Sequence, residues 1–144
     1  MSYSIDSNIL LYASDESSPF SARAKEFLAS LADDSDLLCL TWPTLMAYLR
    51  IATHPSIFSA PLKPAEAWEN IGSLLDLPRC HMIAEEESFP QDYAAVVNGI
   101  TVRGNLVPDA HIATILRQHG VNRLYTVDTD FLKFRFLEVI NPLG

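Results

Sequence analysis

The chain has 144 residues, 49% of them hydrophobic, and its 10 basic and 18 acidic residues give a formal net charge of −8 at pH 7. This length suits a single domain, residues 1–144, that buries a core without disulfide bonds. The negative charge argues against nonspecific binding to nucleic acid, which depends on Lys and Arg neutralising phosphates. That argument weakens where carboxylates surround a metal ion, because the ion reverses the local charge.

The cysteines and the N-terminus bear on the cellular compartment. Cys39 and Cys80 are far apart and have no C-x-x-C spacing, which predicts reduced thiols rather than a zinc site or a disulfide framework. The N-terminal residues lack the basic start of an export signal, and no apolar run approaches the length of a membrane span. We therefore expect a soluble cytoplasmic protein that does not contact a membrane.

Helices and strands alternate along the sequence. Tyr3 to Ile5 predicts a short strand that ends at Asp6 and is followed by a helical turn. Hydrophobic period and turn residues then predict helices over 21–32, from Trp42 to just before Pro55, from Pro64 to about Leu77, over 90–100 and from Pro108 to His119, and strands over 37–40, 81–83, 124–127 and 137–140. This alternation predicts an α/β sandwich with a mostly parallel sheet, in which ligands bind at the carboxyl ends of the strands.

Four aspartates stand at the ends of these predicted elements. Asp6 and Asp128 each follow a strand, Asp130 lies two residues further on, and Asp109 falls in the first turn of a helix. Carboxylates at the ends of core elements require compensation by positive charge, and Mg²⁺ or Mn²⁺ prefers such oxygen ligands. Each residue also has a simpler explanation: Asp6 as a helix N-cap, Asp109 as a favourable charge at a helix N-terminus, and Asp128 to Asp130 as a polar turn. Their joint occurrence favours a metal site.

At these residues the chain resembles the PIN-domain ribonucleases. The three segments that match are Ser4 to Asn8, Gly104 to Ala110 and Thr126 to Phe131. Arg50 to Pro55 and the terminal Asn141-Pro142-Leu143 are, more narrowly, similar to VapC-type toxins of bacterial type II toxin–antitoxin systems. The resemblance runs from end to end and implies a PIN-like three-layer sandwich, in which helices flank a mostly parallel central sheet.

The resemblance also implies an activity and a set of partners. The expected protein is a Mg²⁺- or Mn²⁺-dependent ribonuclease that hydrolyses phosphodiester bonds in tRNA or rRNA, with Asp6, Asp109 and Asp128 as catalytic metal ligands. Asp130, Thr126 and Asn8 are expected to support them. A VapB-type antitoxin is expected to silence the enzyme through an Arg or Lys that reaches the carboxylates.

One position departs from the PIN pattern. A further acidic residue is common on the helix after the second strand, and this chain has Ala47 there. We therefore expect either three carboxylates with Asp130 as a substitute, or a site that holds one ion firmly.

The resemblance further implies a homodimer that pairs through helices near the sheet edge, where Trp42, Met46 and Tyr48 are candidate contacts.

Two other functions stay open. Asp128-Thr129-Asp130 resembles the nucleophile motif of haloacid-dehalogenase-type phosphatases, although only 14 residues follow Asp130, too few for the later motifs of such enzymes. A noncatalytic PIN-like binding module is the other alternative, which the absence of an acid at position 47 favours.

The remaining charged residues have ordinary structural explanations. The four histidines have no zinc-site spacing, and Arg50 is left outside the catalytic set. The run Glu85 to Glu87 is expected to be solvated.

Overall fold

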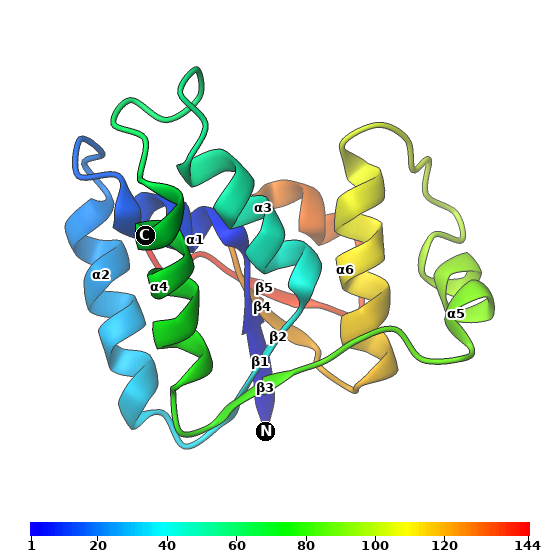
Figure 1. The fold of residues 1–144 in the computed structure, drawn as a ribbon. Coiled ribbons are helices and arrows are strands. Elements are labelled where there is room, and N and C mark those ends of the chain that lie inside the picture. Colours follow the sequence, from blue (N-terminus) through cyan, green and yellow to red (C-terminus); the bar gives the residue numbers. More distant parts are fainter.

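The computed structural model describes residues 1–144 and contains a central sheet between two groups of helices (Figure 1). All four strand pairs are parallel, and the strand order is β3-β2-β1-β4-β5. The strands are β1 (Ser2–Ile5), β2 (Leu37–Leu40), β3 (Cys80–Met82), β4 (Arg123–Tyr125) and β5 (Glu138–Ile140). The helices are α1 (Ser7–Ser14), α2 (Ser21–Ser30), α3 (Trp42–Ala52), α4 (Pro64–Leu75), α5 (Phe89–Val96) and α6 (Leu106–Gln118), with 3₁₀ segments η1 (Leu31–Asp33) and η2 (Thr129–Lys133).

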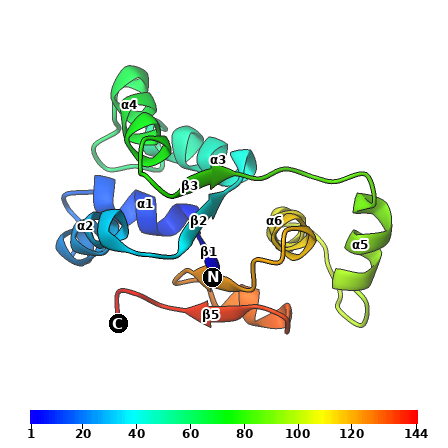
Figure 2. The same cartoon turned by 90° about the horizontal axis from the view of Figure 1, so that it is seen from below.

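The helices cover both faces of the sheet, as Figure 2 shows from below. Helices α1 to α4 pack on one face around Ile5, Leu40 and Tyr48. Helix α6 packs on the other face around Cys39 and Leu124, and α5 lies outside α6. Successive strand residues point to opposite faces, so Leu40 and Cys39 enter different cores. This arrangement confirms the predicted three-layer α/β sandwich.

Most of the predicted elements are present, with shifted boundaries. The segment after Asp6 is a helix of eight residues instead of a single turn. Helix α6 begins at Leu106, two residues before the predicted start at Pro108. Proline fits there because the first turn of a helix has no intrahelical acceptors for its N–H groups.

The predicted stop of α6 at Gly120 is confirmed. Gly120 has a φ of +69°, a conformation that glycine adopts without a steric penalty. Its N–H donates to the carbonyl of Arg117, and the N–H of Val121 donates to that of Leu116, at 3.1 and 2.9 Å. These paired bonds form a Schellman motif, which satisfies carbonyls at the end of the helix.

Strand β4 ends at Tyr125, earlier than the predicted Val127, because the chain turns at Thr126. The Thr126 hydroxyl accepts a hydrogen bond from the N–H of Asp128 at 3.0 Å. Such a side-chain bond competes with the backbone hydrogen bonds between strands. Pairing toward β5 persists for one more residue, since the N–H of Thr126 donates to the carbonyl of Ile140 at 2.9 Å. The turn carries Asp128 away from the strand direction and onto the carboxyl edge of the sheet.

Tyr48 is not available as a dimer contact, contrary to the prediction. Its side chain is 2% exposed, and its hydroxyl lies 2.7 Å from that of Ser14. The hydroxyl also accepts the amide of Asn70 at 2.9 Å, so Tyr48 lies on the face of α3 that packs against α1 and α4.

No helix of the chain is both long and apolar enough to cross a membrane.

Candidate active site

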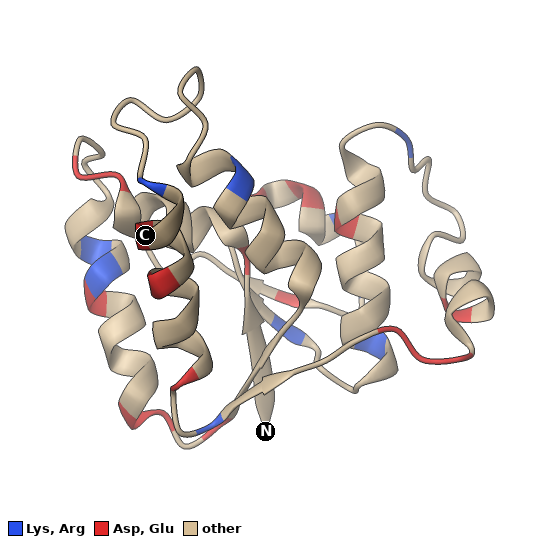
Figure 3. Cartoon of the chain, in the orientation of Figure 1, with Lys and Arg blue, Asp and Glu red and all other residues tan.

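The predicted acidic residues meet at the carboxyl edge of the sheet. Asp6 follows β1, Asp128 follows β4, and Asp109 lies in the first turn of α6, whose N-terminus faces the same edge. Figure 3 shows acidic residues where the upper part of α6 approaches the η2 segment. In an open parallel sheet, this edge is where ligands bind.

Three carboxylates are close enough to share one cation. One carboxylate oxygen each from Asp109, Asp128 and Asp130 lies within 4.8 Å of the other two. Asp128 is also the N-cap of η2, because its Oδ1 accepts the N–H of Asp130 at 2.9 Å. The capping bond fixes the turn that brings Asp130 beside Asp109.

Asp6 adjoins this group but is held by its own hydrogen bonds. Its Oδ1 accepts the N–H of Ser7 at 2.7 Å, so it is indeed the N-cap of α1. Its Oδ2 accepts the hydroxyl of Thr126 at 2.7 Å and the amide of Asn8 at 3.3 Å. The capping role and a place beside the acidic cluster therefore occur together in Asp6.

Thr126 and Asn8 link the first and fourth strands behind the carboxylates. Thr126 is buried, and its Oγ1 accepts the Nδ2 of Asn8 at 3.0 Å while donating to Asp6. The Oδ1 of Asn8 is buried and has no protein donor. A buried acceptor without a hydrogen-bond donor destabilises the folded protein. An ordered water in the site would supply this donor.

Burial and mutual repulsion change the protonation of two of these acids. Burial, then the charges of Asp128, Asp6 and Asp130, raises the pKa of Asp109 to about 7. Burial is also the main cause that raises the pKa of Asp6, and the charge of Asp128 adds to it, while the hydrogen bonds from Thr126 and Ser7 oppose it. A cation among these groups would relieve the repulsion that the pKa of Asp109 reports.

The donor set fits a hard divalent cation. Its carboxylates offer only oxygen ligands, which Mg²⁺ and Mn²⁺ prefer, and neither cysteine nor histidine belongs to the group. The structure thus brings Asp109 and Asp128 together as predicted, with Asp130 as the third member of the group, while Asp6 is close enough for its charge to raise the pKa of Asp109. Helix α3 contributes no carboxylate to the group.

Sequence reasoning missed Lys133, which lies beside the cluster. Its Nζ is 3.6 Å from Oδ1 of Asp130, one helical turn away along η2. The signal in the sequence is the spacing of three residues, which places two side chains on the same side of a helical turn. The positive charge of Lys133 acts to lower the pKa of Asp109, against burial and the carboxylate charges that raise it.

The acidic run before α5 is solvated, as predicted, because Glu85, Glu86 and Glu87 are all exposed. Two of these residues also pair with histidines. Oε2 of Glu85 lies 3.0 Å from Nε2 of His111, and Oε1 of Glu86 lies 3.3 Å from Nε2 of His119. Both histidines are in or directly after α6, so these pairs connect the segment after β3 to that helix.

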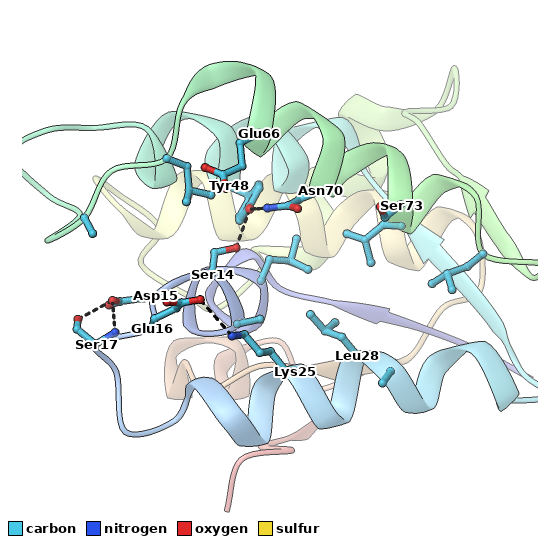
Figure 4. A pocket seen from close by; sticks show the side chains of 17 residues that line it. Ser14, Asp15, Glu16, Ser17, Lys25, Leu28, Tyr48, Glu66, Asn70 and Ser73 are labelled. Carbon is cyan, nitrogen blue, oxygen red and sulfur yellow. Dashed lines mark hydrogen bonds and ion pairs between the residues drawn. The ribbon is translucent and has the colours of Figure 1, made fainter.

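A second concavity lies apart from the acidic cluster, between α1, α2 and α4 (Figure 4). It has a volume of about 650 Å³, and 9 of its 17 lining residues are hydrophobic, including Leu10, Leu28 and Leu74. Polar groups at its wall include the Lys25–Glu16 ion pair, at 3.7 Å. None of the predicted catalytic aspartates lines it.

No protein-family model matches the chain, but individual proteins of known name are similar to it. Ribonuclease VapC48 of Mycobacterium tuberculosis is 36% identical over 144 residues, covering 100% of this chain and 99% of the relative. The fold is similar to that in VapBC2 of Rickettsia felis bound to a promoter DNA fragment, with a TM-score of 0.70, 17% identity and 98% of each chain covered. It is also similar to VapC20 of M. tuberculosis, a sarcin–ricin loop cleaving toxin, with a TM-score of 0.64, 15% identity and coverage of 90% and 92%.

Proposed function

Because the chain belongs to the VapC ribonucleases, the toxins of VapBC toxin–antitoxin pairs, we propose that it hydrolyses RNA with Mg²⁺ or Mn²⁺ held at the acidic cluster. The observation that carries this proposal is the approach of Asp109, Asp128 and Asp130 to within 4.8 Å at the carboxyl edge of the sheet. A noncatalytic module has no need to concentrate carboxylates that repel one another. Burial raises the pKa of Asp109 to about 7, and repulsion by the charges of Asp128, Asp6 and Asp130 adds to that rise.

We assign the binding of the ion to Asp109, Asp128 and Asp130, with Asp6 at the border of the site. A bound Mg²⁺ supplies Lewis acidity, lowers the pKa of a coordinated water and offsets charge on the departing oxygen. Thr126 and Asn8 orient Asp6 through hydrogen bonds, which fixes the direction of its carboxylate. No side chain of the site is required as a covalent nucleophile.

The substrate class we propose is tRNA or rRNA. Cleavage of an isolated RNA pool by the purified protein tests the activity, with Mg²⁺ or Mn²⁺ in one arm and EDTA in another. The sarcin–ricin loop, which VapC20 cleaves, is the first defined RNA to try.

Variants make that experiment specific. Asp109→Asn should abolish discrete cleavage products, while Asp76→Asn, a change at an exposed residue after α4, should leave them. Absence of cleavage by the folded protein on all these RNAs would favour the noncatalytic alternative.

The partner that silences the enzyme is a cognate antitoxin, and VapBC pairs among the structural relatives support this proposal. We place an apolar segment of the antitoxin in the concavity between α1, α2 and α4 (Figure 4). The lining of this concavity combines Leu10, Leu28 and Leu74 with charged groups at the wall. An Arg or Lys further along that segment would then reach Asp6 or Asp109. Leu28→Glu should weaken antitoxin binding without changing cleavage by the toxin alone.

We also propose a homodimer. Trp42 and Trp68 stack with ring centroids 6.3 Å apart, yet they are 41% and 50% exposed. Met46, one turn after Trp42 on α3, is 42% exposed. Large apolar side chains gathered on a surface mark interaction sites, so this patch is the candidate interface.

A further inference from the structure

We infer that the cavity between the α5–α6 connection and η2 holds phosphates of the RNA strand on one side of the cleaved bond. This inference rests on the proposed ribonuclease function and assigns it a substrate-positioning subsite. The cavity has a volume of about 830 Å³, and its 12 lining residues include three cations and no acidic residue. The three cations are Arg117, Lys133 and Arg135.

The charge of this cavity is opposite to that of the protein. The chain carries −8 overall, with only 10 basic residues, and three of these line this one concavity. An acidic protein that must bind a polyanion needs a local concentration of Lys and Arg, since phosphate neutralisation supplies most of the affinity. This cavity is where the fold provides one.

Two of the cations form no salt bridge, although the charge of Arg117 contributes to lowering the pKa of Asp92. Neither Arg117 nor Arg135 forms a salt bridge, and both side chains are exposed. Other arginines are used by the fold: Arg123 pairs with Asp36 at 2.6 Å, and Arg23 and Arg79 bond backbone carbonyls. Arg117 and Arg135 therefore retain their charge and donors for a ligand.

The cavity adjoins the acidic cluster. Lys133 lines it and also lies 3.6 Å from Asp130, so one side chain borders both sites. Helix α6 carries Asp109 near its start and Arg117 two turns later, a separation of about 12 Å along the axis. A strand with one phosphate at the carboxylates can thus place neighbouring phosphates against the cations.

The remaining lining suits a nucleotide better than a simple anion. The guanidinium of Arg117 lies 6.0 Å from the ring centroid of Phe136, which also lines the cavity. Arginine planes and aromatic rings stack bases of single-stranded RNA without regard to sequence. Asn98 and Thr101 add polar groups that can bond sugar or phosphate oxygens.

Binding of a labelled single-stranded RNA oligonucleotide of mixed sequence tests the inference, measured in EDTA so that no cleavage occurs. The double variant Arg117→Gln/Arg135→Gln should bind about tenfold more weakly, and the slope of log K against log salt should fall by about 1.4, about 0.7 for each lost phosphate contact. The matched control is Lys63→Gln, an exposed cation at the start of α4 that lies outside the cavity and the salt bridges. It should leave both values unchanged.

Conservative replacement and thermal unfolding separate loss of charge from loss of fold. Arg117→Lys/Arg135→Lys should keep the salt slope, and Tm should be the same in all variants because both positions are exposed. Unchanged RNA affinity in the glutamine variant, or no RNA binding by the wild-type protein, would overturn the inference. So would a variant that binds RNA normally but loses antitoxin binding.

The failure of this inference is distinguishable from failure of the proposed function. If the glutamine variant cleaves RNA with metal and its KM is unchanged, the ribonuclease function is supported and the subsite is refuted. If the glutamine variant loses RNA binding but the wild-type protein cleaves no RNA, the subsite is supported and the catalytic proposal is refuted.

Discussion

The hydroxyl of Thr126 donates a 2.7 Å hydrogen bond to Oδ2 of Asp6, and so joins the end of β4 to the end of β1. The same oxygen accepts the amide of Asn8 and the N–H of Asp128, both at 3.0 Å. One buried hydroxyl therefore positions groups from two motifs that are 120 residues apart. This connection explains why a threonine directly follows β4, two residues before Asp128.

Replacing Thr126 by Val tests that connection. Valine keeps the volume but leaves the polar groups around it without a partner, so we expect a loss of about 1–3 kcal/mol in the free energy of unfolding. Because Asp6 also loses its orienting donor, kcat/KM should fall by about 10- to 100-fold. Urea unfolding and RNA cleavage measure the two effects. Thr126→Ser, which retains the hydroxyl, should restore most of both; equal losses in the serine variant would contradict the hydrogen-bonding role.

The raised pKa of Asp109 predicts a pH dependence of stability in the metal-free protein. Since its pKa rises from 3.8 to about 7 on folding, the folded state keeps a proton that the unfolded chain has released. The stability associated with this proton is complete below about pH 4 and is lost as the pH rises through 7. Allowing for partial exposure, we expect a decrease of about 1–2 kcal/mol across this range.

Asp109→Asn should remove this pH-dependent contribution, and should make the metal-free protein at least as stable as wild type at pH 8. Urea unfolding in EDTA at several pH values measures it, with Asp76→Asn as the control that keeps the wild-type curve. A marked loss of stability in Asp109→Asn with cleavage intact would instead identify Asp109 as a group that only stabilises the N-terminus of α6.

Metal binding should reverse the repulsion among the carboxylates. Mg²⁺ at a hundredfold excess over its Kd should add about 2.7 kcal/mol to the stability of the folded state. Thermal unfolding with and without Mg²⁺ detects this as a higher Tm. The increase should be absent in Asp109→Asn and retained in Asp76→Asn. A Tm that Mg²⁺ and Mn²⁺ leave unchanged in the wild-type protein would count against the metal site.

The sequence was sufficient to predict that Asp109 and Asp128 meet, and the physical reason is general. Residues that follow parallel strands share one edge of the sheet, and a helix that returns to that edge brings its first turn there. Asp6 belongs to the same edge for the same reason. Strand and helix patterns depend on local periodicity, which a single sequence records.

Other features depend on side-chain direction and on contacts between distant segments. Asp130 joins Asp109 and Asp128 because the capping bond of Asp128 turns the chain, whereas hydrogen bonds from Ser7 and Thr126 hold the carboxylate of Asp6. The cation-lined cavity was not predicted, because Arg117 and Arg135 lie on separate segments that become neighbours only when α6 and η2 pack together. Tyr48 was misplaced because the face of α3 that packs against α1 and α4 was not identified.

The exposed aromatic patch predicts the oligomeric state. We expect multi-angle light scattering to give the mass of a dimer, and Met46→Glu to shift it toward the monomer because a buried charge without a partner is unfavourable. Ile57→Glu is the control, since Ile57 is 56% exposed and lies outside the patch formed by Trp42, Met46 and Trp68. A wild-type mass equal to one chain would refute the homodimer.

The number of bound ions follows from the absence of an acid on α3. With Ala47 in place of a carboxylate and Asp130 within 4.8 Å of Asp109 and Asp128, the cluster has ligands for one ion. Calorimetric titration with Mn²⁺ should therefore give one ion per chain. Asp130→Asn should weaken binding, while Asp33→Asn, a change at an exposed residue of η1, should not. Adding the missing acid as Ala47→Glu should increase Mn²⁺ affinity or add a second ion. Two tightly bound ions in the wild-type protein would show that Asp6 binds metal despite its hydrogen bonds to Ser7 and Thr126, and that a two-metal mechanism operates without an acid at position 47.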